Sequence, residues 1–317
     1  MARRLAVVAR PIANELDSAV SDYLASVKAR GLSPRTVEHY AAVLEKILLP
    51  FLAAEGITTP ADITQRVLDR FSARLLGDGG SRGPLSKHSA HSYLRAVGSF
   101  IRWAKVDGSI TGNAKPQMPK LPRRVLVVMS REQIRQLEDA ATTERDKLIV
   151  RILADSGLRL SELLGLTPDD MVEVGRERYL RVHGKGSKDR LVPVQPQLYT
   201  RLRRFANGRS KDVATDRIFV ALRRDAVSGT YRPLTKRAMS KLMATLAAKV
   251  EITDRPTNVH ALRHAFATHA LRRGMNPVIL QQVLGHADLT QITNTYAHMT
   301  ASDASVAMMA LLSNDED

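Results

Sequence analysis

The sequence predicts a mainly α protein with a small β-sheet, divided into two domains. Most of the chain carries apolar residues at helical spacing between recognisable capping residues. Residues 179–194 alone change to a β-rich pattern, and a basic stretch with three prolines lies near residue 120. We therefore expect a helical domain over residues 1–111, an extended linker over residues 112–126 and a mixed α/β domain over residues 127–317.

The first domain is predicted to be a four-helix unit. Ser33 and Pro34 supply the N-cap and first position of its second helix, and Pro50 should kink or break that helix. Gly31 ends the first helix, and Ser86 caps the fourth. The expected helices span residues 14–30, 33–54, 65–76 and 86–105.

The second domain is predicted to contain helices around one β-hairpin. The turn GKGSKD lies between two β-rich runs, with Lys185 in the turn. Ser161 is expected to cap a short helix that carries Glu162, and Asp288 a late helix that carries Tyr296. The other expected helices begin at Ser130 or span residues 144–155, 196–206, 235–250, 258–273, 276–285 and 301–312.

The charge of the chain indicates a polyanionic partner. The net charge is +16, with +9 in residues 1–125 and +7 in the remainder, so both domains are basic. The absence of cysteine excludes disulfides, thiolate metal sites and cysteine nucleophiles. No apolar run approaches the roughly 20 residues of a membrane-spanning helix. These properties favour a cytoplasmic, nucleoid-associated protein that binds nucleic acid and no membrane.

One helix face suits a bound anion. His260, Arg263 and His264 are spaced i, i+3 and i+4, which places them on the same face. Tyr296 follows on a later helix and suits a nucleophile, although a phenol with a pKa of about 10 needs roughly 4 kcal/mol of activation at neutral pH. Each histidine alone is better explained as an ordinary residue at a helix surface or at the edge of the core. The set together favours a catalytic site.

The order of these features resembles the tyrosine recombinases of the phage-integrase family, in particular the Xer-like members. The similarity covers nearly the whole chain and implies a helical, SAM-like core-binding domain followed by the catalytic domain. Ala265 departs from the pattern, because many relatives carry Ser there. The resemblance rests on Arg159 in GLRLSELLGL, Lys185 in the hairpin, His260-x-x-Arg263, His286 in LGH, and Tyr296.

The resemblance also implies a mechanism without a metal or cofactor. Tyr296 would attack a DNA phosphodiester, giving a 3′-phosphotyrosyl link, and strands would be exchanged through a Holliday junction. The implied partners are a double-stranded core recombination site and three further protomers, in a homotetramer on two sites that the C-terminal tail helps to assemble. The implied roles are phosphate binding for Arg159, Arg263 and His286, general acid for Lys185, base or proton shuttle for His260, and support for Glu162.

Three predicted helices begin with basic faces that are candidates for DNA contact, because helix N-termini bind phosphate well and such side chains can reach the DNA backbone or groove. A solvated surface is an equally good explanation for any one of them. In the first domain they are Arg35, His39, Lys87, His88, His91 and Arg95; in the second they are Lys236, Arg237 and Lys241.

Three other functions remain open. The i, i+4 pair His260 and His264 has the spacing of zinc ligands, but no HExxH glutamate follows the first histidine. A second is a DNA-binding regulator that keeps the fold and catalyses no reaction. The presence of a suitable residue at every proposed catalytic position argues against it. A type IB topoisomerase would share the chemistry without pairing two sites, and a recombination assay separates it.

Overall fold

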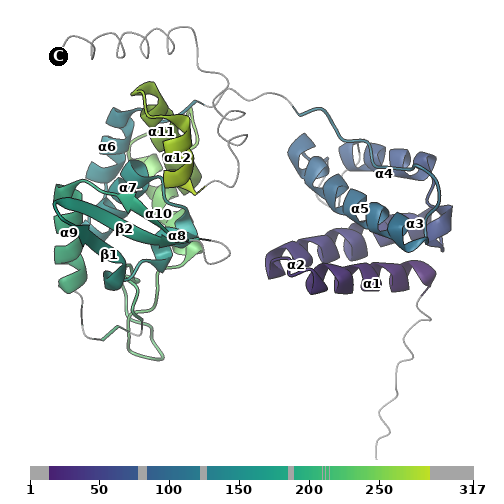
Figure 1. Ribbon diagram of the computed structural model, residues 1–317, viewed down its shortest axis with the longest axis horizontal. Helices are drawn as coiled ribbons and strands as arrows, with labels where there is room; N and C mark the ends of the chain where they lie inside the picture. The colour runs from purple at the N-terminus through teal and green to yellow at the C-terminus, as the bar shows by residue number, and fades with distance from the viewer. Residues whose placement is uncertain are drawn as a thin grey trace, which may run out of the picture. The chain divides into compact units, whose positions relative to one another are not determined.

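The structure, a computed structural model, describes residues 14–77, 84–121, 127–184 and 189–285, apart from residues 209, 211 and 214. The chain divides into two compact units, Met1–Arg124 and Val125–Asp317. The described residues are mainly helical and contain one three-stranded sheet, which confirms the predicted fold class (Figure 1).

The first unit is helical throughout its regular structure, and its helices begin where the capping residues predict. The side chain of Asn14 accepts from the backbone N–H of Asp17, and Ser86 caps α5 in the same way. Tyr23 lies at the centre of the core, with its ring 5.6 Å from that of Phe100. The helices are α1 (Glu15–Ala29), α2 (Pro34–Val43), α3 (Leu49–Ala54), α4 (Gln65–Gly77) and α5 (Lys87–Asp107).

Pro50 does not break the helical path, which was one of the two outcomes expected at this position. A π-helical turn, Leu44–Leu48, joins α2 directly to α3, and Pro50 lies in the first turn of α3. Proline lacks the N–H that would bond four residues back, and the wider π turn accommodates that loss without leaving helical conformation. The second predicted helix is therefore one helical path containing a π segment.

The first residues of the predicted linker lie against the first unit. The side-chain amide of Gln65 in α4 donates to the carbonyl of Lys115 at 3.0 Å and accepts from its N–H at 2.9 Å. Pro116 is buried and lies about 3.8 Å from the position of a Cβ on Gly98 in α5. The described part of this segment has no regular secondary structure, and it contacts α4 and α5.

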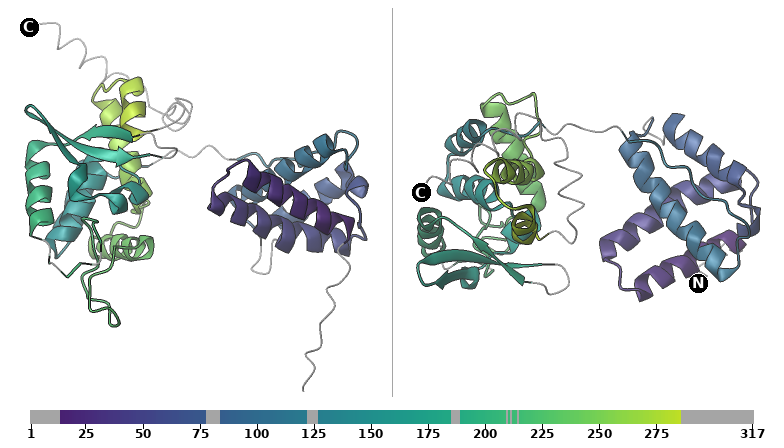
Figure 2. Two further views of the ribbon diagram at one scale, coloured as in Figure 1. Left: turned by 60° about the horizontal axis from the view of Figure 1, so that its bottom comes forward. Right: turned by 45° about the horizontal axis from the view of Figure 1, so that its top comes forward.

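The second unit is built around α7, which is buried along most of its length and packs against α6, α9 and α11. Ser130 and Thr143 cap α6 and α7, and the left-handed Gly157 ends α7. Figure 2 shows the helices gathered on one side of the sheet, with α9 beside the strands. The helices are α6 (Arg131–Asp139), α7 (Glu144–Ser156), α8 (Leu160–Gly165), α9 (Pro196–Asn207), α10 (Lys236–Lys249), α11 (Val259–Arg272) and α12 (Pro277–Leu284).

The sheet contains the predicted hairpin and one further strand. β2 (Glu177–His183) pairs antiparallel with β3 (Asp189–Pro193), and His183 lies opposite Asp189. β1 (Met171–Val174) pairs with the other edge of β2 and was not predicted. Gly175, with φ +56°, provides the tight turn between β1 and β2.

Helices α11 and α12 form a short helical hairpin whose ends match the sequence prediction. Asn258 caps α11, Asn276 caps α12 with Pro277 at its first position, and Gly285 ends α12 with φ +63°. Phe266, Leu280 and Leu284 form a small core between them. None of the helices in the described ranges is long and apolar enough to cross a membrane.

Candidate active site

Arg263 is held in the interior by two backbone carbonyls. Its side chain enters from the first turns of α11, and the residue is only 5% exposed. One terminal nitrogen donates to the carbonyl of Gly157 at 2.6 Å and the other to that of Leu284 at 2.7 Å. The planar guanidinium has little freedom to rotate, because donors at both ends of its fork are committed. Its position is therefore set by the ends of α7 and α12.

Arg159 lies at the start of α8 and is bonded to the neighbouring helix end. It is itself the N-cap residue, which corrects the expectation that Ser161 caps this helix. Glu162, at the third helical position, accepts from the backbone N–H of Arg159 at 2.7 Å and from its guanidinium at 2.9 Å. The guanidinium also donates to the carbonyl of Gly285 at 2.9 Å. The side chain remains 41% exposed, so a bound ligand can reach it.

Arg190 on β3 is a third arginine of this cluster, and the sequence analysis missed it. It donates to both carboxylate oxygens of Glu162, at 3.0 and 2.9 Å, and its Nε donates to the carbonyl of Val283 at 2.7 Å. Arg190 and the buried Val192 are two residues apart, so they lie on the same face of β3, whereas Leu191 lies on the other face and is exposed. An arginine on the inward-facing side of a strand is the signal that could have identified it.

The three arginines meet the C-terminal end of α12 at three consecutive carbonyls, those of Val283, Leu284 and Gly285. The last carbonyls of a helix have no partner within the helix and carry the negative end of its dipole. Guanidinium groups therefore bind there favourably. We call this arrangement of Arg159, Arg190, Arg263 and the three carbonyls the α12 arginine cluster.

Two glycines permit the close packing of the α12 arginine cluster. A Cβ on Gly157 would lie 2.5 Å from Cδ1 of Phe266, and one on Gly285 would lie 2.9 Å from a terminal nitrogen of Arg190. Both residues also have positive φ, +62° and +63°, which disfavours any other residue. Gly157 and Gly285 are thus required for their size and their backbone conformation.

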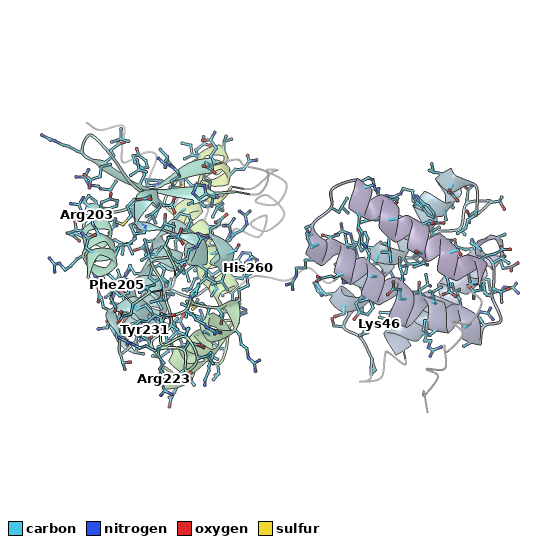
Figure 3. The ribbon with its side chains drawn as sticks, turned by 90° about the horizontal axis from the view of Figure 1, so that it is seen from below. Lys46, Arg203, Phe205, Arg223, Tyr231 and His260 are labelled. Atoms are coloured by element: carbon cyan, nitrogen blue, oxygen red, sulfur yellow. The ribbon has the colours of Figure 1, made fainter. Side chains whose placement is uncertain are left out.

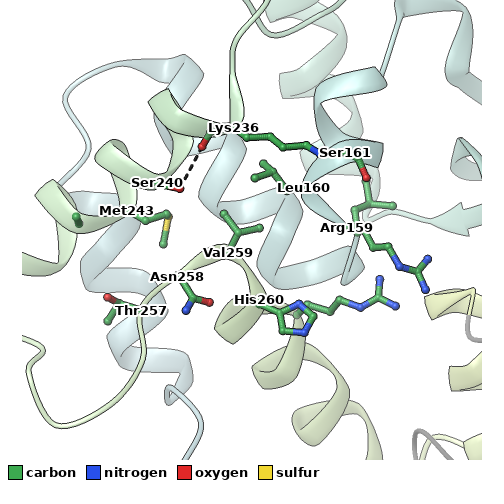
Figure 4. A pocket seen from close by; sticks show the side chains of 13 residues that line it. Arg159, Leu160, Ser161, Lys236, Ser240, Met243, Thr257, Asn258, Val259 and His260 are labelled. Carbon is green, nitrogen blue, oxygen red and sulfur yellow. Dashed lines mark hydrogen bonds between the residues drawn. The ribbon is translucent and has the colours of Figure 1, made fainter. Parts of the chain in front are cut away.

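The exposed face of the cluster opens into a pocket of about 520 Å³ between α8, α10 and α11. Arg159, Arg263, His260 and Lys236 are among the residues that line this pocket (Figure 4). Figure 4 shows the Lys236 side chain extending toward Ser161. This gathering of cationic groups around one cavity suits a phosphate group.

His260 lies at the surface of the unit (Figure 3), where the walls of the pocket shield its ring in part from water, and its environment is positive. Loss of contact with water, followed by the charges of Arg263 and Arg159, holds the pKa of His260 below its usual value. Its ring lies edge-on to that of His264, with centroids 4.7 Å apart. A neutral imidazole at pH 7 can accept a proton, as a base must.

Glu162 is ionised, although it is 6% exposed at its side chain. Burial alone would raise its pKa, and the hydrogen bonds from Arg190 and Arg159 outweigh that effect and lower it. Removing one partner from a buried ion pair costs about 3–5 kcal/mol, because the other charge is left uncompensated. Glu162 therefore links Arg159 and Arg190 rather than offering a proton.

The remaining predicted catalytic residues, Lys185, His286 and Tyr296, lie outside the described residues, as does the predicted tail helix. Val283, Leu284 and Gly285 are the last described positions before His286. Within the described part of the chain, no group of three or more His, Asp or Glu side chains could hold a metal ion.

The candidate DNA-contacting residues lie at exposed or half-buried positions. Lys236 lines the pocket, and Arg237 and Lys241 are exposed on the same helix. In the first unit, a 3.2 Å hydrogen bond between His39 and Ser92 joins the second turns of α2 and α5. That contact places two groups of basic residues on adjoining helices: Arg35 and His39 on α2, and Lys87, His91 and Arg95 on α5.

Comparisons with known proteins agree with this arrangement. The phage integrase family profile matches residues 127–303. Tyrosine recombinase XerC of Pelobacter propionicus is 32% identical over 280 residues, covering 86% of this chain and 87% of that protein. Tyrosine recombinase XerA of Saccharolobus solfataricus is 32% identical over 251 residues, covering 77% of each chain.

Solved structures share the fold. The Tn1549 transposon integrase in complex with transposon right-end DNA has a TM-score of 0.72 at 20% identity, covering 93% of this chain and 99% of that chain. A lambda integrase tetramer bound to a Holliday junction has a TM-score of 0.66 at 19% identity, covering 87% and 78%. With the family profile matching more than half of the chain, the protein belongs to the phage integrase family of tyrosine recombinases.

Proposed function

We propose that this protein is a site-specific DNA recombinase that cleaves and rejoins DNA strands through a covalent tyrosine intermediate. The observation that carries the proposal is the pocket that brings Arg159, Arg263 and His260 together. Both arginines donate hydrogen bonds to backbone carbonyls at the end of α12, and the chain continues from there to His286 and Tyr296.

The two arginines bind the scissile phosphate in this proposal. Their guanidinium groups are already oriented by carbonyls and by Glu162, so little reorganisation accompanies the reaction. They stabilise the negative charge that grows on the non-bridging oxygens as the phosphorus becomes five-coordinate. Loss of one such preorganised donor typically costs about 10²–10³-fold in rate. Arg159 and Arg263 thus supply the electrostatic part of the catalysis.

Tyr296 is the proposed nucleophile. Its phenolic oxygen forms a bond to phosphorus, its proton passes to a base, and the bond from phosphorus to the 5′-oxygen breaks. Lys185 donates a proton to that oxygen, His260 serves as the base or shuttle, and His286 hydrogen-bonds the phosphate. The products are a 3′-phosphotyrosyl link and a free 5′-hydroxyl. The link retains the phosphodiester energy, so rejoining needs no nucleotide, metal or other cofactor.

DNA binding and assembly follow from the same proposal. The basic N-terminal parts of α2, α5 and α10 would contact the backbone or groove of the core site in the cytoplasm, at the nucleoid. Four protomers would pair two sites, with residues 301–312 contributing to contacts between protomers. Deleting residues 300–317 should then weaken assembly on paired sites more than binding to one site. Equal losses in gel-shift titrations would contradict this role for the tail.

The test is capture of the covalent intermediate. Randomly nicked genomic DNA from the source organism is incubated with the full-length protein in excess EDTA and then denatured with detergent. A nick near the cleavage position lets the short strand end diffuse away, so the adduct cannot reseal. Protein-linked DNA is recovered and sequenced, which also identifies the site.

The wild-type protein should yield adducts at one site, and Tyr296→Phe should yield none while binding that site with similar affinity. Equal adduct yields from both proteins would refute Tyr296 as the nucleophile. Binding without any adduct would favour a regulator that does not cleave. Adducts without strand exchange between two such sites would favour a topoisomerase-like activity.

A further inference from the structure

The structure assigns Arg190 as a positioning residue for the cleavage step, an inference that rests on the proposed function. We propose that Arg190 fixes the orientation of Arg159 through Glu162, and the end of α12 through the carbonyl of Val283. One guanidinium thereby connects three elements: β3, α8 and α12. Arg190 contributes by placing other groups, because its donors are directed to Glu162 and Val283.

The geometry of the bonds supports this role. Arg190 donates in bidentate fashion to the two oxygens of Glu162. The Glu162 oxygen that accepts from Arg190 at 3.0 Å also accepts from Arg159 at 2.9 Å, so the carboxylate is a bridge between two guanidiniums. Rotation of Glu162 would move Arg159, and Arg190 prevents that rotation. The side chains of Glu162 and Arg190 are only 6% and 13% exposed, so water competes little for these bonds.

The position of Arg190 in the chain shows what it connects. It follows Lys185 by five residues on the same hairpin, and its acceptor Val283 precedes His286 by three residues. The hydrogen bond from Arg190 to Val283 thus joins the hairpin that carries Lys185 to the segment that leads to His286. Arg159, the phosphate-binding residue of α8, is tied to both through Glu162.

A lysine cannot replace these bonds. Lysine offers one compact ammonium, whereas Arg190 uses a planar fork for the carboxylate and Nε for the carbonyl. Arg190→Lys therefore keeps the charge and removes the geometry. Displacement of reacting groups by about 1 Å can cost on the order of 10²-fold in rate, so a loss of that order is expected in the cleavage step.

Arg145 provides a matched control. It is a buried arginine of the same unit, it donates twice to Asp146, and it donates once to the carbonyl of Val220 at 2.8 Å. The side chains of Arg145 and Asp146 are 10% and 8% exposed, close to those of the Arg190–Glu162 pair. Arg145 does not line the pocket. Arg145→Lys should therefore affect folding as Arg190→Lys does, without a specific effect on cleavage.

The experiment measures single-turnover adduct formation by full-length protein on a nicked duplex of the captured site, at saturating protein. Arg190→Lys should reduce the rate constant by roughly 10²-fold relative to Arg145→Lys, with both variants binding the duplex similarly. The inference would be overturned if both variants formed adducts at the wild-type rate. It would also be overturned if the decrease in rate constant of each variant only tracked its decrease in thermal stability. Failure of the wild-type protein to form an adduct would instead refute the proposed function.

Two further readouts separate positioning from general stability. Glu162→Gln combined with Arg190→Lys should lose little more than the worse single variant, because both act through one bridge. In Arg190→Gln, Glu162 loses the hydrogen bond and the charge of Arg190, both of which lower its pKa, so the pKa of Glu162 should rise from its lowered wild-type value. The ratio of wild-type to variant rate constants should increase as the pH falls, and adding Glu162→Gln should remove that increase. Additive losses in the double variant, or a ratio independent of pH, would contradict the proposal. The additivity test does not depend on Arg190→Gln being stable enough to assay.

Discussion

Gly157 offers the sharpest test of how α7, α11 and α12 come together. Its φ is +62°, and an added Cβ would lie 2.5 Å from Cδ1 of Phe266 and 2.7 Å from Cδ2 of Leu284. The left-handed conformation costs a residue with a Cβ about 1–2 kcal/mol. Forcing apart a packed interior costs a further 1–3 kcal/mol or so. Gly157→Ala should therefore lower the free energy of unfolding of the second unit by about 2–5 kcal/mol.

Gly175→Ala is the matched control. Gly175 has φ +56° in the same unit, and nothing lies within 4 Å of an added Cβ. It should therefore lose only the conformational cost, about 1–2 kcal/mol. The difference between the two variants isolates the packing of α11 and α12 against the end of α7.

The assay is urea unfolding followed by circular dichroism and by tryptophan fluorescence. Trp103, the one tryptophan in the sequence, lies in α5 and reports on the first unit. A transition seen by circular dichroism and not by fluorescence belongs to the second unit, and linear extrapolation gives its free energy. Equal losses for Gly157→Ala and Gly175→Ala would refute the close approach of Phe266 and Leu284 to Gly157.

Three other outcomes are expected. Because both halves of the chain are basic, affinity for the captured site should fall steeply, by about 10³-fold or more between 50 and 200 mM salt, in gel-shift titrations; a flat dependence would contradict contacts from both units. Arg159→Ala should raise the pKa of His260 toward its usual value, since the charge of Arg159 helps to lower it, and an unchanged NMR titration would argue against their proximity. Hydrogen bonds to Asp189 and then Asp170 raise the pKa of His183. The folded state thus favours protonated His183, and this stabilisation is present below about pH 6.5 and lost as pH rises through the higher folded pKa. Asp189→Asn should lower the pKa of His183 in the same NMR titration, and no change would contradict the contact across the hairpin.

Local patterns predicted much of the fold. The ends of α11 and α12 follow from Asn258, Asn276 and Gly285, whose preferences depend on their own backbone conformation. The common face of His260 and Arg263 follows from helical spacing alone. The Glu162–Arg159 contact is likewise a local one, between residues three apart. Sequence reasoning succeeds at this range because the interacting groups belong to one turn of chain.

The sequence did not predict the contacts between elements that lie far apart in the chain. Arg190 meets Glu162 and Val283 only because β3, α8 and α12 converge, and no local spacing encodes that convergence. Ser161 was expected to cap α8 because serine is a common N-cap, yet Glu162 reaches back to Arg159 and makes it the cap residue. The π turn before Pro50 likewise depends on packing between distant residues. Leu44 and Leu48, at its two ends, are fully buried in the core of the first unit.

The central claim is that Tyr296 becomes linked to DNA, and one measurement tests it most directly. The adduct formed in EDTA by wild-type protein on the nicked duplex is digested with nuclease and protease, and the nucleotide-bearing peptide is sequenced by mass spectrometry. The phosphate should be found on Tyr296, in the peptide that follows His286. A phosphate on any other residue, or an adduct that forms only when a divalent metal is supplied, would contradict the proposed chemistry.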